Sequence, residues 1–153
     1  MSAAGVAEAA PHNRREAVHL RPAYLVAVWV GGTLGTASRY LIGLSVPHLG
    51  RLPVATFGIN VTGAFVLGVL LERLALGGAD QGRRRLVRLA AGTGFLGGYT
   101  TYSTLAVDTV SLWRDGLPAE AVAYALGTLV IGAAAAALGI FIAARFRRPG
   151  ARR

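Results

Sequence analysis

The sequence of 153 residues contains no cysteine, and all 16 of its basic residues are arginine. The absence of cysteine excludes disulfides, thiolate metal sites and cysteine nucleophiles. Charged residues make up only 15% of the chain, whereas a soluble domain carries about 25%, and 54% of the residues are hydrophobic. This composition indicates a protein whose solvent is lipid.

Four long apolar stretches divide the sequence. Each is close to the roughly 20 residues that a helix needs to cross about 30 Å of hydrocarbon. Pro22 and Pro118 stand just ahead of the first and fourth stretches, and Pro53 is the second residue of the second; proline suits the first turn of a helix. Short connectors make consecutive helices antiparallel neighbours, so the predicted fold is an all-α membrane protein with four transmembrane helices. The stretches span residues 24–46, 52–71, 89–107 and 121–144.

The arginines are distributed unevenly between the two ends of this predicted bundle. All of them except Arg39, Arg51 and Arg114 fall on the side of the N-terminus. Positively charged flanks stay in the cytoplasm, so both termini are predicted to be cytoplasmic. The asymmetry explains the net charge of +9 without a nucleic-acid partner. We expect a disordered cytoplasmic tail over residues 1–22, a membrane domain over 23–146 and a basic tail over 147–153.

Carboxylates, lysine and histidine are absent from the middles of the four apolar stretches. A proton-coupled pump or a multidrug exporter needs a titratable group there, and catalysis would need a base near the hydroxyls. The sequence therefore predicts that the chain is not an enzyme. Neutral hydrogen-bonding groups suit passive conduction of a small hydrated ion. They are Thr33, Thr36, Ser38, Thr56, Asn60, Thr62, Thr93, residues 99–104, Tyr124 and Thr128.

Two polar residues have more than one interpretation from the sequence alone. The amide of Asn60 offers two N–H donors to an anion, but asparagine also joins helices by hydrogen bonds, and both interpretations stay open. Arg39 ends the first stretch, where it can reach the interface and complement the C-terminus of its helix. Its spacing favours a structural anchor over an ion site.

Glycines mark the third stretch. Gly97 and Gly98 precede six aromatic or hydroxylated residues, which favours a break that frees backbone carbonyls at membrane depth. Gly94 and Gly98 also have the small-xxx-small spacing of closely packed helices. Gly31 and Gly35 share this spacing, and for them packing is the favoured interpretation.

These motifs identify a resemblance to the Fluc/CrcB fluoride-channel family over residues 24–144. The first motif is Gly31-Gly32-Thr33-Leu34-Gly35 followed by Arg39-Tyr40, and the second runs from Thr56 to Asn60 with Gly63. The most specific motif runs from Gly94 to Thr104 and resembles the family's glycine-glycine-x-threonine-threonine-aromatic-serine-threonine signature.

The resemblance implies an antiparallel dimer with two fluoride pores in the bacterial plasma membrane, with the third helix broken near its middle. It implies a structural sodium ion, which is not transported, held by the backbone carbonyls of Gly97 and Thr100. It implies passive export of fluoride, because hydrogen fluoride enters as a neutral acid and the anion is trapped in the cytoplasm. The implied ion pathway comprises Arg39, Asn60, Tyr102, Ser103, Thr104, Tyr124 and Thr128.

Two features depart from the family pattern. Tyr102 and Leu105 replace two phenylalanines whose electropositive ring edges face fluoride; tyrosine keeps the edge and leucine removes it. The arginine asymmetry favours one orientation in the membrane, whereas an antiparallel homodimer needs both. We therefore hypothesise that this subunit pairs with a homologue of opposite orientation. The alternatives are a non-conducting partner or scaffold subunit, and a small multidrug-type exporter, whose first-helix carboxylate is missing here.

Overall fold

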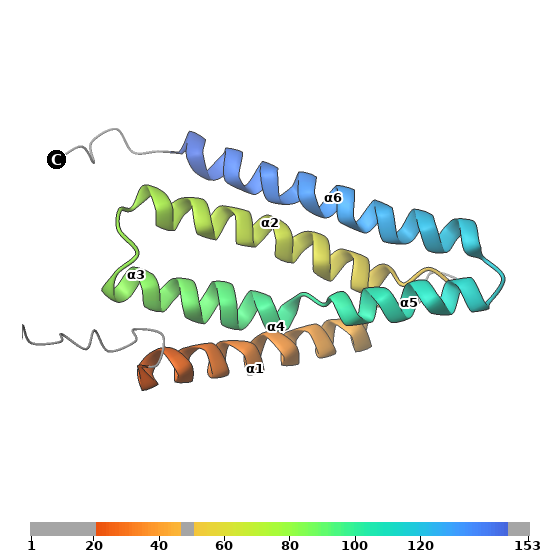
Figure 1. Cartoon of the computed structure of the whole chain (residues 1–153), viewed down its shortest axis with the longest axis horizontal. Coiled ribbons are helices and arrows are strands. Elements are labelled where there is room, and N and C mark those ends of the chain that lie inside the picture. The colour runs from red at the N-terminus through yellow and green to blue at the C-terminus, as the bar shows by residue number, and fades with distance from the viewer. Residues whose placement is uncertain (1–20, 47–50, 147–153) are drawn as a thin grey trace, which may run out of the picture.

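The computed structural model describes residues 21–46 and 51–146, and every regular element within them is a helix. The predicted tails therefore lie outside the described residues, apart from Arg21 and Pro22. The elements are α1 (Pro22–Ser45), α2 (Val54–Leu76), α3 (Gly82–Val87), η2 (Arg88–Leu96), α4 (Gly97–Tyr99), α5 (Tyr102–Arg114) and α6 (Pro118–Arg145). In Figure 1 these helices lie side by side along one long axis, with α2 between α6 and the run from α3 to α4.

Three of the helices, α1, α2 and α6, are long and apolar enough to cross a membrane. They coincide with the first, second and fourth predicted stretches. Pro22 and Pro118 occupy the first turns of α1 and α6, and Pro53 directly precedes α2. Proline suits these places because the first N–H groups of a helix have no partner within it. The prolines therefore locate the helix starts correctly.

The third predicted stretch is divided in the structure. Residues 82–99 are helical throughout, with η2 wound as a π-helix, and α5 follows after two extended residues. Thr100 has ψ 157° and Thr101 has φ −149° with ψ 118°. Figure 1 shows the ribbon opening between α4 and α5 at this point. We call Thr100 and Thr101 the interruption.

Glycines allow α1 to approach η2 and α4 closely. A Cβ atom at Gly35 would lie 2.0 Å from the carbonyl oxygen of Phe95, and one at Gly31 would lie 2.2 Å from that of Ala90. The prediction that Gly31 and Gly35 serve packing agrees with this geometry. A Cβ at Gly98 would lie 2.4 Å from the carbonyl oxygen of Gly32. Gly98 therefore has a packing role, whereas the sequence favoured the break for it.

Glycines also allow α2 and α6 to approach each other closely. A Cβ at Gly68 would meet the carbonyl oxygen of Ala136 at 2.3 Å, and one at Gly139 would meet that of Phe65 at 2.3 Å. Helices in lipid have no hydrophobic drive to associate, so close backbone contact between small residues stabilises the pair. These two groups of glycine contacts thus bring the first helix to the third stretch and the second helix to the last.

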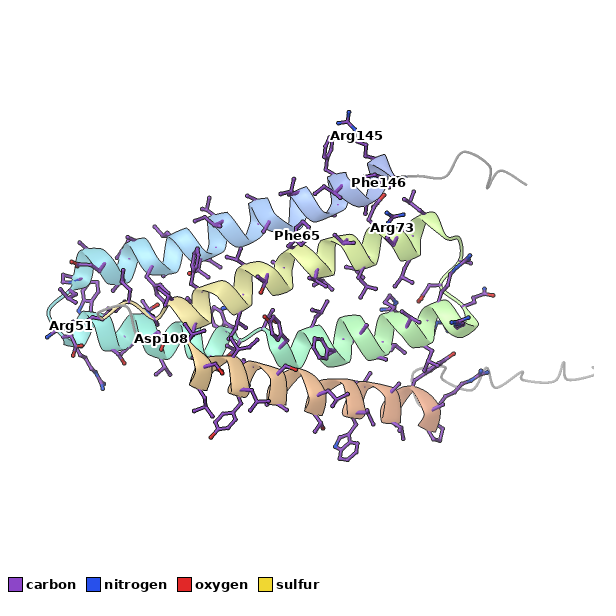
Figure 2. All side chains as sticks on the ribbon, turned by 180° about the vertical axis from the view of Figure 1, so that it is seen from behind. Arg51, Phe65, Arg73, Asp108, Arg145 and Phe146 are labelled. Carbon is purple, nitrogen blue, oxygen red and sulfur yellow. The ribbon has the colours of Figure 1, made fainter. Side chains whose placement is uncertain are left out.

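Arginines gather at one end of the molecule. Figure 2 shows Arg73, Arg145 and Phe146 together at one end and Arg51 at the other. Arg73 donates a hydrogen bond to the carbonyl oxygen of Phe146 at 3.4 Å, which joins the ends of α2 and α6. Arg51 donates to the carbonyl oxygen of Asp115 at 3.4 Å. These side chains hold the helix ends together at both ends of the bundle.

Candidate functional site at the helix interruption

The chain restarts as α5 because Thr101 caps that helix. Its hydroxyl oxygen accepts a hydrogen bond from the backbone N–H of Thr104 at 3.2 Å. The same oxygen lies 3.0 Å from the hydroxyl of Thr104 and 3.2 Å from that of Ser103. A threonine at this position satisfies one of the free N–H groups of a helix start. The hydroxyl-rich sequence therefore stabilises a new helix start at the interruption.

Asn60, on α2, binds the backbone of the interruption with both ends of its amide. Its Nδ2 donates to the carbonyl oxygen of Thr101 at 3.0 Å, and its Oδ1 accepts from the N–H of Thr101 at 2.8 Å. The pair satisfies both backbone groups of a residue that has left the helix. The structure thus gives Asn60 the interhelical hydrogen bond that was one of its two open interpretations. One N–H of Nδ2 is left over for another acceptor.

Arg39, on α1, approaches the interruption from the opposite side. Its Nε donates to the carbonyl oxygen of Gly98 at 3.1 Å, and Thr36 donates to the same oxygen at 3.4 Å. Arg39 is half-buried. Its spacing favoured an anchor at the membrane interface and at the C-terminus of its own helix. The structure instead shows Arg39 bonded to the backbone of α4.

Three carbonyl oxygens beside the interruption have no donor among the described residues: those of Gly97, Tyr99 and Thr100. In a continuous helix the N–H of Thr101 would serve Gly97 and that of Thr104 would serve Thr100. Here the first of these N–H groups binds Asn60 and the second binds the hydroxyl of Thr101. Gly97 is exposed and Tyr99 and Thr100 are half-buried, so these oxygens keep lone pairs that a donor or a cation could reach.

Five of the predicted site residues line one groove with a volume of about 480 Å³, which runs between α2, the interruption and α6. Gly97 is exposed, and a Cβ there would meet no atom within 4 Å. Thr128 is buried, and its hydroxyl already donates to the carbonyl oxygen of Tyr124 at 2.7 Å. The groove is lined by Asn60, Gly97, Thr100, Tyr102 and Thr128, together with Gly63, Leu96, Leu105, Gly132 and others.

The remaining predicted residues lie elsewhere. Arg39 lines a groove along α1, and Tyr124 lines a separate cavity of about 370 Å³ beside Phe57. Ser103 and Thr104 belong to the first turn of α5 and its cap. The structure therefore brings together part of the predicted pathway and leaves Arg39 and Tyr124 outside the groove.

Tyr102 and Leu105 take opposite environments on α5. Tyr102 is 78% exposed at the groove, whereas Leu105 is 5% exposed and packs in a core with Leu112, Ala121 and Tyr124. Leucine at position 105 thus fills the contact between α5 and α6. Its burial supplies a packing reason for this residue.

Asp108 is a polar residue that directly follows the predicted third stretch, which ends at residue 107. The structure places it in the middle of α5, half-buried, where its carboxylate accepts a hydrogen bond from the hydroxyl of Tyr124 at 3.2 Å. Hydropathy alone ended the stretch at residue 107. The sequence signal for a membrane-embedded Asp108 was the hydroxyl of Tyr124 in the fourth stretch, a possible donor to this carboxylate. The resemblance assigned that hydroxyl to the ion pathway instead.

Three membrane-length helices and an interrupted third stretch beside a polar groove define a helical membrane protein. The chain belongs to the CrcB family, because the model of the CrcB-like protein, Camphor Resistance (CrcB), matches residues 26–140. The sequence-based assignment to this family is confirmed.

Curated relatives carry the name of an ion channel and not of an enzyme, in agreement with the prediction that this chain is not an enzyme. Fluoride-specific ion channel FluC 2 of Leifsonia xyli subsp. xyli is 54% identical over 127 residues, which cover 83% of this chain and 88% of that protein. Fluoride-specific ion channel FluC 1 of Cutibacterium acnes is 44% identical over 114 residues, covering 74% and 80%. Fluoride-specific ion channel FluC 2 of Bacillus subtilis is 38% identical, covering 78% and 86%.

Proposed function

We propose that this chain is one subunit of a passive, fluoride-selective channel that lets fluoride leave the cytoplasm. The names of its relatives support the ion, and the groove at the interruption supports the route. The observation that carries the proposal is Asn60, whose amide binds Thr101 and keeps one N–H for an anion at the groove. A neutral donor can replace part of the hydration of fluoride without trapping it.

Conduction needs no coupled energy source. Hydrogen fluoride crosses a membrane as a neutral acid and ionises in a near-neutral cytoplasm, so fluoride accumulates inside. Asn60 and the exposed ring of Tyr102 line the groove through which the anion would leave. Thr128 lines the groove but offers the anion no donor, because its single proton is donated to the carbonyl oxygen of Tyr124.

A structural sodium ion fits the carbonyl pattern. Oxygen ligands suit hard cations, and the carbonyls of Gly97 and Thr100 lack donors among the described residues. Of the neighbouring carbonyls, that of Gly98 accepts from Arg39 and that of Thr101 accepts from Asn60, whereas that of Tyr99 has no donor among the described residues. Gly97 and Thr100 would hold the ion, which would stabilise the extended backbone without being transported.

We further propose an antiparallel dimer in which the partner is a homologue of opposite orientation. The groove is open on the surface of one subunit, and Gly97 and Tyr102 on its wall are exposed. A second subunit would cover them and place its own interruption opposite this one. The arginine asymmetry supports a single orientation for this chain, with the chain crossing the membrane four times and both termini in the cytoplasm.

Fluoride efflux from liposomes tests the channel proposal. The full chain is joined to a second copy through an added transmembrane helix, so that the two copies are forced to be antiparallel. Liposomes loaded with potassium fluoride should release fluoride on addition of valinomycin, and liposomes loaded with chloride should retain it. A fluoride electrode and a chloride electrode measure both.

Two controls sharpen this test. Liposomes without protein give the background leak, and liposomes with N-methylglucamine in place of sodium on both sides should lose the fluoride flux. A folded tandem that releases no more fluoride than empty liposomes would overturn conduction by two copies of this chain. The same result with the homologue of opposite orientation as the second half of the tandem would overturn the channel proposal. Undiminished fluoride flux after thorough removal of sodium would contradict the proposal of a structural sodium ion.

Orientation is tested separately by fusing topology reporters to the C-terminus of the single chain. A reporter active only in the cytoplasm should be active, and one active only outside should be silent, because most arginines flank the cytoplasmic side. Glutamine in place of Arg83, Arg84 and Arg85 should raise the fraction of the opposite orientation. Comparable activity of both reporters with the unchanged chain would contradict a fixed orientation.

A further inference from the structure

A second polar site lies at the end of the molecule where α1 and η2 begin. A pocket of about 300 Å³ opens between these two helices and the loop that precedes α3. Asp80, Arg85 and Arg88 form its charged side, and apolar side chains form the rest. The apolar lining consists of Tyr24, Leu25, Val28 and Leu89. This pocket is separate from the groove at the interruption.

One carboxylate serves two guanidinium groups in this pocket. Arg88 donates to Asp80 through Nε at 3.1 Å and Nη2 at 2.9 Å, and Arg85 donates through Nε at 3.4 Å. These hydrogen bonds lower the pKa of the Asp80 carboxyl, with the bond from Arg88 as the largest cause, so it remains ionised at neutral pH. The three side chains together keep a net positive charge.

The arginines keep donors for a further acceptor. A guanidinium has five N–H groups, and Asp80 engages only Nε and Nη2 of Arg88 and Nε of Arg85. Within residues 21–46 and 51–146, no other carboxylate forms an ion pair with either arginine. Asp80 thus orients the two guanidinium groups and leaves their outer edges for a ligand with negatively charged oxygens.

The apolar wall shows what kind of molecule would carry those oxygens. Leu25 is 55% exposed and lies in the first turn of α1. Because α1 is long and apolar enough to cross a membrane, lipid would surround this side chain. Val28 follows one turn deeper, and Leu89 faces the pocket from η2. A ligand in this pocket would therefore meet charge at the headgroup level and hydrocarbon immediately below it.

We propose that this pocket binds the headgroup phosphate of an anionic phospholipid. Arginine donates to phosphate through paired N–H groups, and basic pockets between transmembrane helices bind such headgroups. The glycerol and upper acyl chain would lie along Leu25, Val28 and Leu89. This site goes beyond the proposed function and depends only on the chain lying in a membrane.

Lipid retention by the purified full chain tests the site. The protein is equilibrated with mixed micelles of phosphatidylglycerol and phosphatidylcholine, and bound lipid is counted by native mass spectrometry. We expect Arg88→Gln to weaken phosphatidylglycerol binding about fivefold, and Arg85→Gln to weaken it in the same direction. Arg83→Gln is the matched control, because Arg83 is an exposed neighbour that does not line the pocket. It should bind phosphatidylglycerol as the unchanged chain does.

Several results would overturn the site. Equal losses in Arg83→Gln and Arg88→Gln would show diffuse attraction, and equal retention of both lipids would show no recognition of the headgroup. Displacement of phosphatidylglycerol by millimolar inorganic phosphate would assign the pocket to a free anion. Circular dichroism and thermal unfolding identify a variant that fails to fold; Arg85→Gln then supplies the result. Fluoride flux is measured independently, so either proposal can fail without the other.

Discussion

Replacement of Asn60 by alanine is expected to reduce fluoride efflux by more than about tenfold and to lower the thermal stability of the subunit. The change leaves the N–H and carbonyl of Thr101 without their partners, and each unsatisfied buried group costs about 1–3 kcal/mol. It also removes the N–H that we assign to the anion. Efflux from liposomes and thermal unfolding in detergent measure the two effects.

Asn60→Asp separates these two roles. The carboxylate keeps an acceptor for the N–H of Thr101, but it offers no donor and adds a negative charge beside the groove. We therefore expect it to keep the contact with the N–H of Thr101 and to block fluoride. Thr33→Val is the control, because among the described residues this exposed hydroxyl bonds only to the carbonyl oxygen of Trp29 in its own helix. Normal flux through Asn60→Asp would show that the side chain contacts no anion.

A methyl group at Gly35 is expected to destabilise the subunit far more than the same group at Gly43. Both glycines lie in α1. A Cβ at Gly35 would lie 2.0 Å from the carbonyl oxygen of Phe95 and 2.9 Å from the backbone nitrogen of Tyr99, whereas one at Gly43 would meet nothing within 4 Å. Overpacking against backbone costs about 1–3 kcal/mol or more, because neither helix can yield without moving the interruption.

The comparison of Gly35→Ala with Gly43→Ala cancels the effect of alanine on helix propensity, which favours alanine by roughly 0.5–1 kcal/mol in a helix interior. Gly43→Ala should therefore unfold at the same temperature as the unchanged chain or slightly above it. Gly35→Ala should unfold at a clearly lower temperature or fail to accumulate. Equal unfolding temperatures for the two variants would contradict the close contact of α1 with η2 and α4.

The sequence predicted the long helices because their cause is local. Lipid as solvent requires apolar residues over about 20 positions, and α1, α2 and α6 follow that pattern with proline at or just before their starts. The third stretch was predicted in position but not in extent. Hydropathy ended it at residue 107, whereas α5 continues to Arg114 and contains Asp108, whose carboxylate accepts a hydrogen bond from the hydroxyl of Tyr124.

The motif from Gly94 to Thr104 located the candidate site, but not the contacts of each residue. Gly98 has a packing role because Gly32 of α1 approaches it, and Leu105 is buried against α6. Neither neighbour can be identified from spacing within one helix. Arg39 was predicted as an anchor, yet its acceptor, the carbonyl oxygen of Gly98, lies 59 positions along the chain.

By itself, the sequence determined that this chain is a helical membrane protein, to which family it belongs and which segment carries its polar chemistry. These follow from composition, apolar length and the order of motifs. Only the tertiary structure decided what Asn60 bonds to and which carbonyls beside the interruption remain free. The physical reason is that a backbone group released from one helix takes its partner from whichever helix packs beside it, and glycine contacts between distant segments select that neighbour.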